Sequence, residues 1–139
     1  MPLHWTLDSR LRIFVATCDG NVDVSEVNVM LDAVVGANGL GYRKLFDSTN
    51  GSTQMSSIDM LGIGVRIRAL QDGDREHGPL AVVIPDNKYA ILSRVLGILA
   101  AAKRPMRVFK DADKARKWLD SPAVRASLPA FAATEELPV

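Results

Sequence analysis

The chain has 139 residues, a length that suits one domain built around a single hydrophobic core. Its 17 Lys and Arg residues nearly balance 16 Asp and Glu, and 47% of the residues are apolar, which is typical of a globular protein and not of a disordered one. A net charge of +1 argues against a dedicated binder of nucleic acid, because phosphate contacts call for a basic excess. The single cysteine, Cys18, cannot close an internal disulfide.

The chain opens with a pattern that predicts a β-hairpin. Residues 3–8 alternate between apolar and polar side chains, and residues 11–18 form an apolar run rich in branched side chains. Residues 19–21, Asp-Gly-Asn, have the chemistry of a turn. We therefore expect two antiparallel strands at one edge of a sheet, closed by a turn before the first helix.

A capping box predicts the first helix over residues 23–37. Asp23 is followed three positions later by Glu26, the spacing at which the two side chains satisfy each other's backbone N–H groups. A short strand is expected at 41–46. The seven small or polar residues that follow, 47–53, predict a loop, because they offer nothing to pack into a core.

The second half of the chain alternates helices and strands. Ser56 and Asp59 repeat the capping spacing and predict a helix over 56–71, and the continuously apolar run 80–84 is typical of a strand covered on both faces. Asp86 is expected to cap a third helix that closes at 104–105. A strand at 106–109, a fourth helix from Asp111 and a C-terminal arm or tail over 121–139 follow.

The predicted fold is thus α/β, with the order β-β-α-β-α-β-α-β-α and a mixed sheet of roughly five strands in residues 1–120. This order, together with the helix segment Asp59-Met60-Leu61-Gly62-Ile63-Gly64-Val65, resembles the STAS domains, and more closely the SpoIIAA-like group of small bacterial proteins related to anti-sigma-factor antagonists. The resemblance implies a regulatory binding module. In that family a serine beside this helix start is phosphorylated, but the matching register places Met60 and Leu61 on the serine positions.

Two further serines lie one turn earlier, so Ser56 and Ser57 are the remaining candidates for a phosphorylation switch. A phosphate at a helix start would lie among free backbone N–H groups. Plain capping by Ser56 is the simpler interpretation, and we favour it.

Candidate reactive groups do not form a recognisable catalytic set. Asp19, Asp47, Asp86 and Asp111 each follow an expected strand, where clustered carboxylates could hold Mg²⁺ for phosphate chemistry. Asp19 suits a turn and Asp86 and Asp111 suit helix caps, so only Asp47 lacks an evident structural task. His4 and His77 are expected to be solvated surface residues. Cys18 is expected to be buried and to pack in the core. Basic residues gather over 103–117 and indicate a solvated rim or a surface for an anionic partner.

The second and third helices carry more apolar residues than one buried stripe requires, which indicates deeper core, a homodimer contact or a ligand groove. We therefore expect a non-enzymatic module without a cofactor that binds a protein partner or ligand at the second helix and the loop before it. Two alternatives are a carrier of a small apolar or lipid-like ligand between the second and third helices, and a Mg²⁺-dependent phosphate enzyme that uses the strand-end aspartates. The predicted binding residues are Asp47, Ser48, Met55, Ser56, Ser57, Ile58, Met60 and Leu61.

The start of the chain has no basic and apolar signal pattern, and the longest apolar run, 95–102, is too short to cross a bilayer. We therefore expect a cytoplasmic protein without stable membrane insertion.

Overall fold

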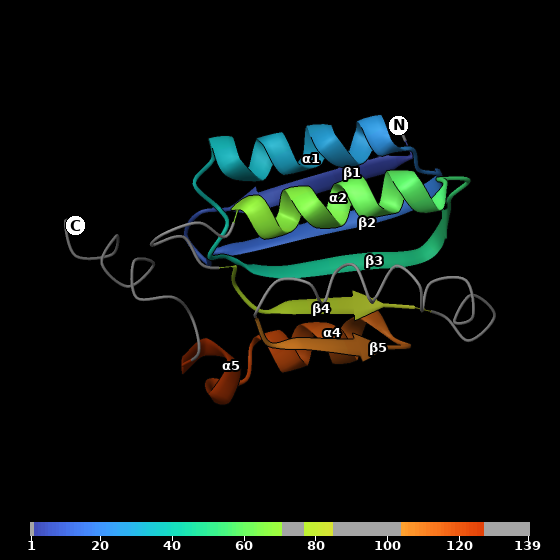
Figure 1. The fold of residues 1–139 in the computed structure, drawn as a ribbon. Coiled ribbons are helices and arrows are strands. Elements are labelled where there is room, and N and C mark those ends of the chain that lie inside the picture. Colours follow the sequence, from blue (N-terminus) through green and yellow to red (C-terminus); the bar gives the residue numbers. More distant parts are fainter. Residues whose placement is uncertain (1, 71–76, 85–103, 127–139) are drawn as a thin grey trace.

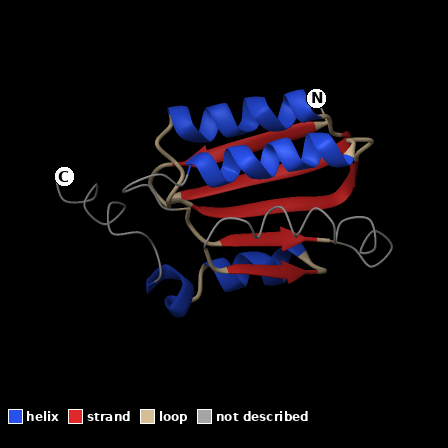
Figure 2. Cartoon of the chain, viewed as in Figure 1, coloured by secondary structure: helices blue, strands red, loops and turns tan. Residues whose placement is uncertain are grey.

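A computed structural model of the chain describes residues 2–70, 77–84 and 104–126 (Figure 1). These residues form an α/β fold with helices on both faces of one sheet (Figures 1 and 2). The elements, in chain order, are β1 (Leu3–Asp8), β2 (Ile13–Asn21), α1 (Val24–Gly36), β3 (Arg43–Ser52), α2 (Ser57–Leu70), β4 (Leu80–Val83), β5 (Met106–Phe109), α4 (Ala112–Leu119) and α5 (Pro122–Ala126).

The sheet has five strands in the order β1-β2-β3-β4-β5, so each strand lies beside its neighbour in the sequence. β1 runs antiparallel to β2, and β2, β3, β4 and β5 run parallel to one another. The mixed sheet of five strands is thus confirmed. The expectation that both strands of the hairpin would form an antiparallel edge is wrong for β2, which joins the parallel part of the sheet.

Two stretches that were predicted as turn and loop belong instead to strands. β2 continues through residues 19–21, and β3 continues through Ser52, where Asp19 pairs with Asn50 and Asn21 pairs with Ser52. A bulge interrupts this pairing, because two residues of β3, Ser48 and Thr49, lie opposite the single Cys18. Backbone pairing with β2 therefore carries the strand into a polar stretch that supplies little to the core.

The helices begin where the capping patterns predict. Oδ1 of Asp23 accepts a hydrogen bond from N of Glu26 at 2.8 Å, and Oε1 of Glu26 accepts one from N of Asp23 at 3.3 Å, which completes the capping box of α1. Ser56 and Asp59 form the same reciprocal pair at the start of α2, with distances of 3.1 and 3.3 Å. Asp111 caps α4 by accepting from N of Asp113 at 2.7 Å.

Each face of the sheet has its own core. α1 and α2 lie side by side over one face, above β1, β2 and β3 (Figure 1). α4 covers the opposite face near β4 and β5, where Ala115 and Leu119 pack on Leu45, Ala81 and Val83. The short α5, which replaces part of the expected arm, adds Val124 to this second core. The sheet therefore has two separate cores, one beneath α1 and α2 and the other beneath α4 and α5.

Two predictions lie outside the described residues. The third helix, expected from Asp86 to the Arg104-Pro105 pair, falls almost entirely within 85–103, and most of the C-terminal arm falls within 127–139.

Candidate functional site

A cavity of about 150 Å³ lies between the α1–α2 layer and the sheet. Its wall is mostly apolar and comes from α1, α2, β2 and β3. Apolar side chains that line it include Phe14, Cys18, Val27, Met30, Val34, Phe46, Met55, Ile63 and Ile67. Three basic side chains, Lys44, His77 and Arg104, also line it. The cavity therefore combines an apolar body with a basic cluster, and this basic cluster is the feature that needs a chemical explanation.

The three basic residues come from neighbouring positions in the sheet. Lys44 is the first residue of β3 that pairs with β4, opposite Leu80. His77 precedes β4 and Arg104 precedes β5, so the basic cluster lies at the amino ends of three parallel strands. Backbone hydrogen bonds hold these ends together: N of Leu80 donates to O of Pro105 at 2.9 Å, and N of Lys44 donates to O of Pro79 at 2.8 Å.

Lys44 is a buried lysine whose ammonium donates to two backbone carbonyls within the described residues. Nζ donates to O of Leu40 and to O of Tyr42, the latter at 3.0 Å. Burial, and secondly the positive charge of Arg104, hold the pKa of Lys44 well below its ordinary value. The lysine shares the cavity face with Phe46, because alternate residues of a strand point to the same side.

His77 is buried as well, so the expectation that it is a solvated surface histidine is wrong. Its side chain lies with Nε2 2.8 Å from O of Ile67 in α2, while Nδ1 is buried and has no hydrogen-bond partner among the described residues. Burial is the main reason that its pKa falls to about 4, with smaller contributions from the charges of Arg104 and Lys44. His4, by contrast, is exposed as predicted.

Arg104 extends the basic cluster toward β5. Burial lowers its pKa to about 10. The prediction of a solvated basic rim over 103–117 is wrong for Arg104, because this residue lines the cavity. Lys103 lies outside the described residues. Arg107 and Phe109 both lie in β5. The guanidinium carbon of Arg107 lies over the ring of Phe109, 5.3 Å from the ring centroid.

Of the predicted binding residues, only Ser48 and Met55 line the cavity. The buried Ser48 donates from Oγ to O of Val83 at 2.6 Å and so links β3 to β4. Met55 is half-buried at the connection between β3 and α2 and packs against the core beneath α1. The structure thus assigns the loop before α2 to one wall of the cavity.

Asp47 and Ser56 both hold local backbone structure in place. Oδ1 of Asp47 accepts hydrogen bonds from N and Oγ1 of Thr49 at 3.0 and 2.6 Å, so the expectation that Asp47 lacks a structural task is wrong. The alternation of β3 puts Asp47 on the face opposite Ser48, away from the cavity. Ser56 caps α2, which confirms the capping interpretation.

The remaining predicted residues lie on the outer side of α2. Ile58, Leu61 and Val65 are 80, 62 and 68% exposed, and their spacing of three and four positions places them on one face of the helix. We call these three residues the α2 stripe. Ser57 is also exposed and Met60 is half-buried. Gly62 is also exposed, with no neighbouring atom near its Cβ position.

The strand-end aspartates do not meet in one site within the described part of the chain. Asp19 lies inside β2, Asp47 inside β3, and Asp111 caps α4, while Asp86 lies outside the described residues. No group of three His, Cys, Asp or Glu side chains among residues 2–70, 77–84 and 104–126 is arranged to hold a metal ion.

The basic cluster was missed because its members are far apart in the sequence. One available signal was a lysine two positions before Phe46 in the predicted strand, so that the two residues share a strand face. A histidine directly before Gly78 and the buried β4 was a second signal, although a charged flanking loop concealed it.

Comparison with known proteins does not assign the chain to a family: no protein-family model matches it, and no curated protein matches it as a relative. Within the part of the chain that the structure describes, no helix is both long and apolar enough to span a membrane.

Proposed function

We propose that this protein is a non-enzymatic binding module that holds a small apolar ligand in the cavity between the α1–α2 layer and the sheet. The observation that carries the proposal is the cavity itself, which is lined mostly by apolar side chains of both layers. It differs from the expected groove between the second and third helices in its walls, because α1 takes part.

The size of the cavity sets the size of the ligand. Its volume of about 150 Å³ equals that of an engineered apolar cavity that stays dry and binds benzene. Apolar walls gain nothing from water, whereas an apolar ligand restores the dispersion contacts that an empty space lacks. A ligand of roughly six to ten non-hydrogen atoms fits this volume.

A pair of matched variants tests the proposal. Val34→Phe enlarges a side chain on the cavity wall, and Val29→Phe makes the same change on the exposed side of the same helix. We expect 1-hexanol to raise the thermal midpoint of the wild type and of Val29→Phe, but not that of folded Val34→Phe. Circular dichroism establishes folding, and Val34→Leu serves as a smaller block if the phenylalanine disrupts α1.

Native mass spectrometry of freshly purified protein is an independent measurement. A small apolar adduct that dissociates on mild activation is the expected result. Failure of benzene, 1-hexanol and every other small apolar probe to shift the midpoint of the wild type would refute the proposal.

A second candidate function is contact with another protein through the α2 stripe. Ile58, Leu61 and Val65 expose apolar surface together, and single exposed apolar residues do not usually gather on one helix face. This candidate accords with the regulatory role that the resemblance to SpoIIAA-like proteins implies. The partner that we propose for the α2 stripe is a second copy of this chain, so the protein should self-associate through the stripe.

Sedimentation equilibrium tests this second candidate. Wild-type protein should show a mass that rises with concentration, and Leu61→Asp should remain monomeric. Arg68→Asp, a change at an exposed residue of the last turn of the same helix, is the control. A monomeric wild type at high concentration would remove self-association as a function of the stripe.

A further inference from the structure

We propose that the cavity ligand carries a carboxyl head group, which Lys44, His77 and Arg104 receive at the amino ends of β3, β4 and β5. This inference rests on the proposed function, because it specifies the ligand of the same cavity. The ligand would then be a small monocarboxylic acid with an apolar body, and the basic cluster would bind its carboxyl group.

Lys44 supplies the first contact. An ammonium group has three N–H donors, and in Lys44 two of them are used by O of Leu40 and O of Tyr42. Within the described residues Lys44 forms no ion pair, although a buried charge is normally balanced by an opposite one. A ligand carboxylate beside Nζ would accept the third donor and supply the negative charge.

His77 supplies a second and complementary contact. O of Ile67 can only accept a hydrogen bond, so Nε2 of His77 carries the proton in the neutral ring and Nδ1 presents a lone pair. Nδ1 is buried without a partner in the described part of the chain. A carboxylate that binds together with one proton matches this arrangement, because that proton can lie between one carboxyl oxygen and Nδ1 while the other oxygen accepts from Lys44. A hydrocarbon can pair with neither group, and an alcohol could pair with both but brings no negative charge to the basic cluster.

Arg104 adds positive charge to the same end of the cavity. Arg104 lines the same cavity as Lys44 and His77, and its charge lowers the pKa of both groups. The remaining wall is apolar and small, which favours a short acyl chain or a single ring over a long lipid tail. Charge complementarity and cavity size thus point to the same class of ligand.

Two probes of matched length test the head group separately from the apolar body. Hexanoate and 1-hexanol are titrated into ¹⁵N-labelled protein at pH 7, and dissociation constants are taken from backbone amide shifts. In the wild type we expect hexanoate to bind about tenfold more tightly than 1-hexanol, since a charge-assisted hydrogen bond in a buried site contributes that much.

The Lys44→Met variant keeps the length of the side chain and removes its charge. We expect the preference for hexanoate to fall to about twofold or less, with little change in the affinity for 1-hexanol. Lys114→Met is the matched control, because Lys114 is exposed on α4, on the other face of the sheet, and this variant should keep the wild-type preference.

The outcomes separate the inference from the proposed function. Equal affinity of the wild type for the two probes, or an unchanged preference in folded Lys44→Met, overturns the carboxyl head group and leaves apolar binding in place. Binding of neither probe overturns both. The wild-type comparison decides the inference even if Lys44→Met does not fold.

Discussion

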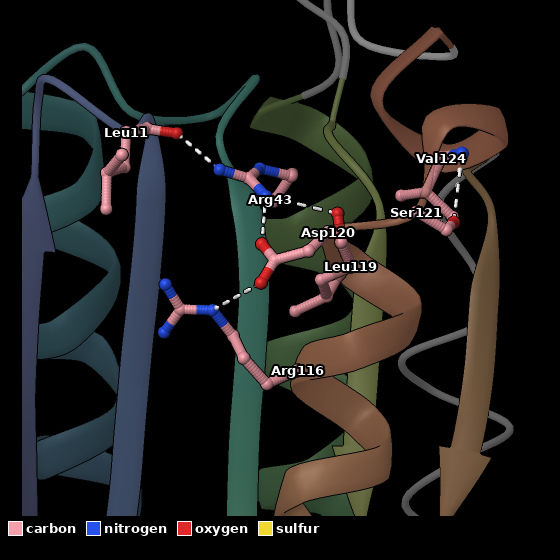
Figure 3. A network of polar contacts seen from close by, with 7 residues as sticks. All are labelled: Leu11, Arg43, Arg116, Leu119, Asp120, Ser121 and Val124. Atoms are coloured by element: carbon pink, nitrogen blue, oxygen red, sulfur yellow. Dashed lines mark hydrogen bonds and ion pairs between the residues drawn. The ribbon is translucent and has the colours of Figure 1, made fainter.

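Arg43 at the start of β3 forms an ion pair with Asp120 just beyond α4, with Nη1 2.7 Å from Oδ1 (Figure 3). The same Nη1 donates to O of Leu119 at 3.1 Å, and Nη2 donates to O of Leu11 at 2.5 Å. Arg43 is 1% exposed. One guanidinium therefore joins the β1–β2 connection and the end of α4 to the middle of the sheet.

Replacement of Arg43 should be among the most destabilising single changes in the protein. Arg43→Met removes the donors that satisfy the carbonyls of Leu119 and Leu11, and we expect it to lower the free energy of unfolding by about 3 kcal/mol or more. Asp120→Ala should cost about 1 kcal/mol, because Asp120 is half exposed and the carbonyl contacts of Arg43 remain. Urea denaturation measures both, and equal losses would contradict this account of the network.

Two glycines should respond in opposite directions to the same substitution. A Cβ on Gly78 would overlap the backbone carbonyls of Gly41 and Tyr42, so Gly78→Ala forces the approach to β4 away from β3. We expect a loss of at least about 2 kcal/mol. Gly62→Ala places a methyl group in open space on α2 and should stabilise the protein by about 0.5–1 kcal/mol through helix propensity. Thermal unfolding that ranks the two variants the other way would refute the prediction.

The sequence predicted the elements whose local signals agree with their packing. The capping pairs at Asp23 and Ser56 set the starts of α1 and α2, and the unbroken apolar run of β4 is buried throughout, as expected. These signals depend on residues within one turn or one strand, so no distant part of the chain has to be known.

The errors arise where distant residues decide the outcome. The polar stretch after Phe46 is strand because β2 offers it backbone partners, and strand formation depends more on such context than on the residues themselves. The basic cluster escaped prediction for a related reason. Lys44 and His77 are 33 positions apart by their numbers and meet at the cavity only through the pairing of β3 with β4.

The contribution of Ser56 to the start of α2 can be measured by removing its hydroxyl group. Ser56→Ala removes the oxygen that accepts from N of Asp59, and we expect a loss of about 1 kcal/mol of stability. Ser57→Ala is the matched control at the next position, which is exposed, and it should change stability by about 0.5 kcal/mol or less. Chemical denaturation of both variants gives the answer, and a larger loss for Ser57→Ala would show that the cap lies elsewhere.

His77 predicts how stability depends on pH. Burial lowers its pKa from 6.5 to about 4 in the folded protein, so between these values the unfolded chain binds more protons than the folded one. Stability should therefore fall as the pH drops from about 6.5 toward 4, and the contribution of His77 to this fall is at most about 3 kcal/mol. Above pH 6.5 the imidazole is neutral in both states and contributes no slope.

The histidine-to-glutamine change separates His77 from the other titrating groups. In His77→Gln the free energy of unfolding, measured by urea denaturation at several pH values, should lose much of its slope between pH 4 and 6.5, because no buried imidazole has to stay unprotonated. His4→Gln removes an exposed imidazole and should keep the wild-type slope. An identical slope in the wild type and His77→Gln would mean that His77 takes up its proton equally well in the folded and unfolded chain. That result would contradict the burial of the His77 ring beside Ile67 in the folded protein.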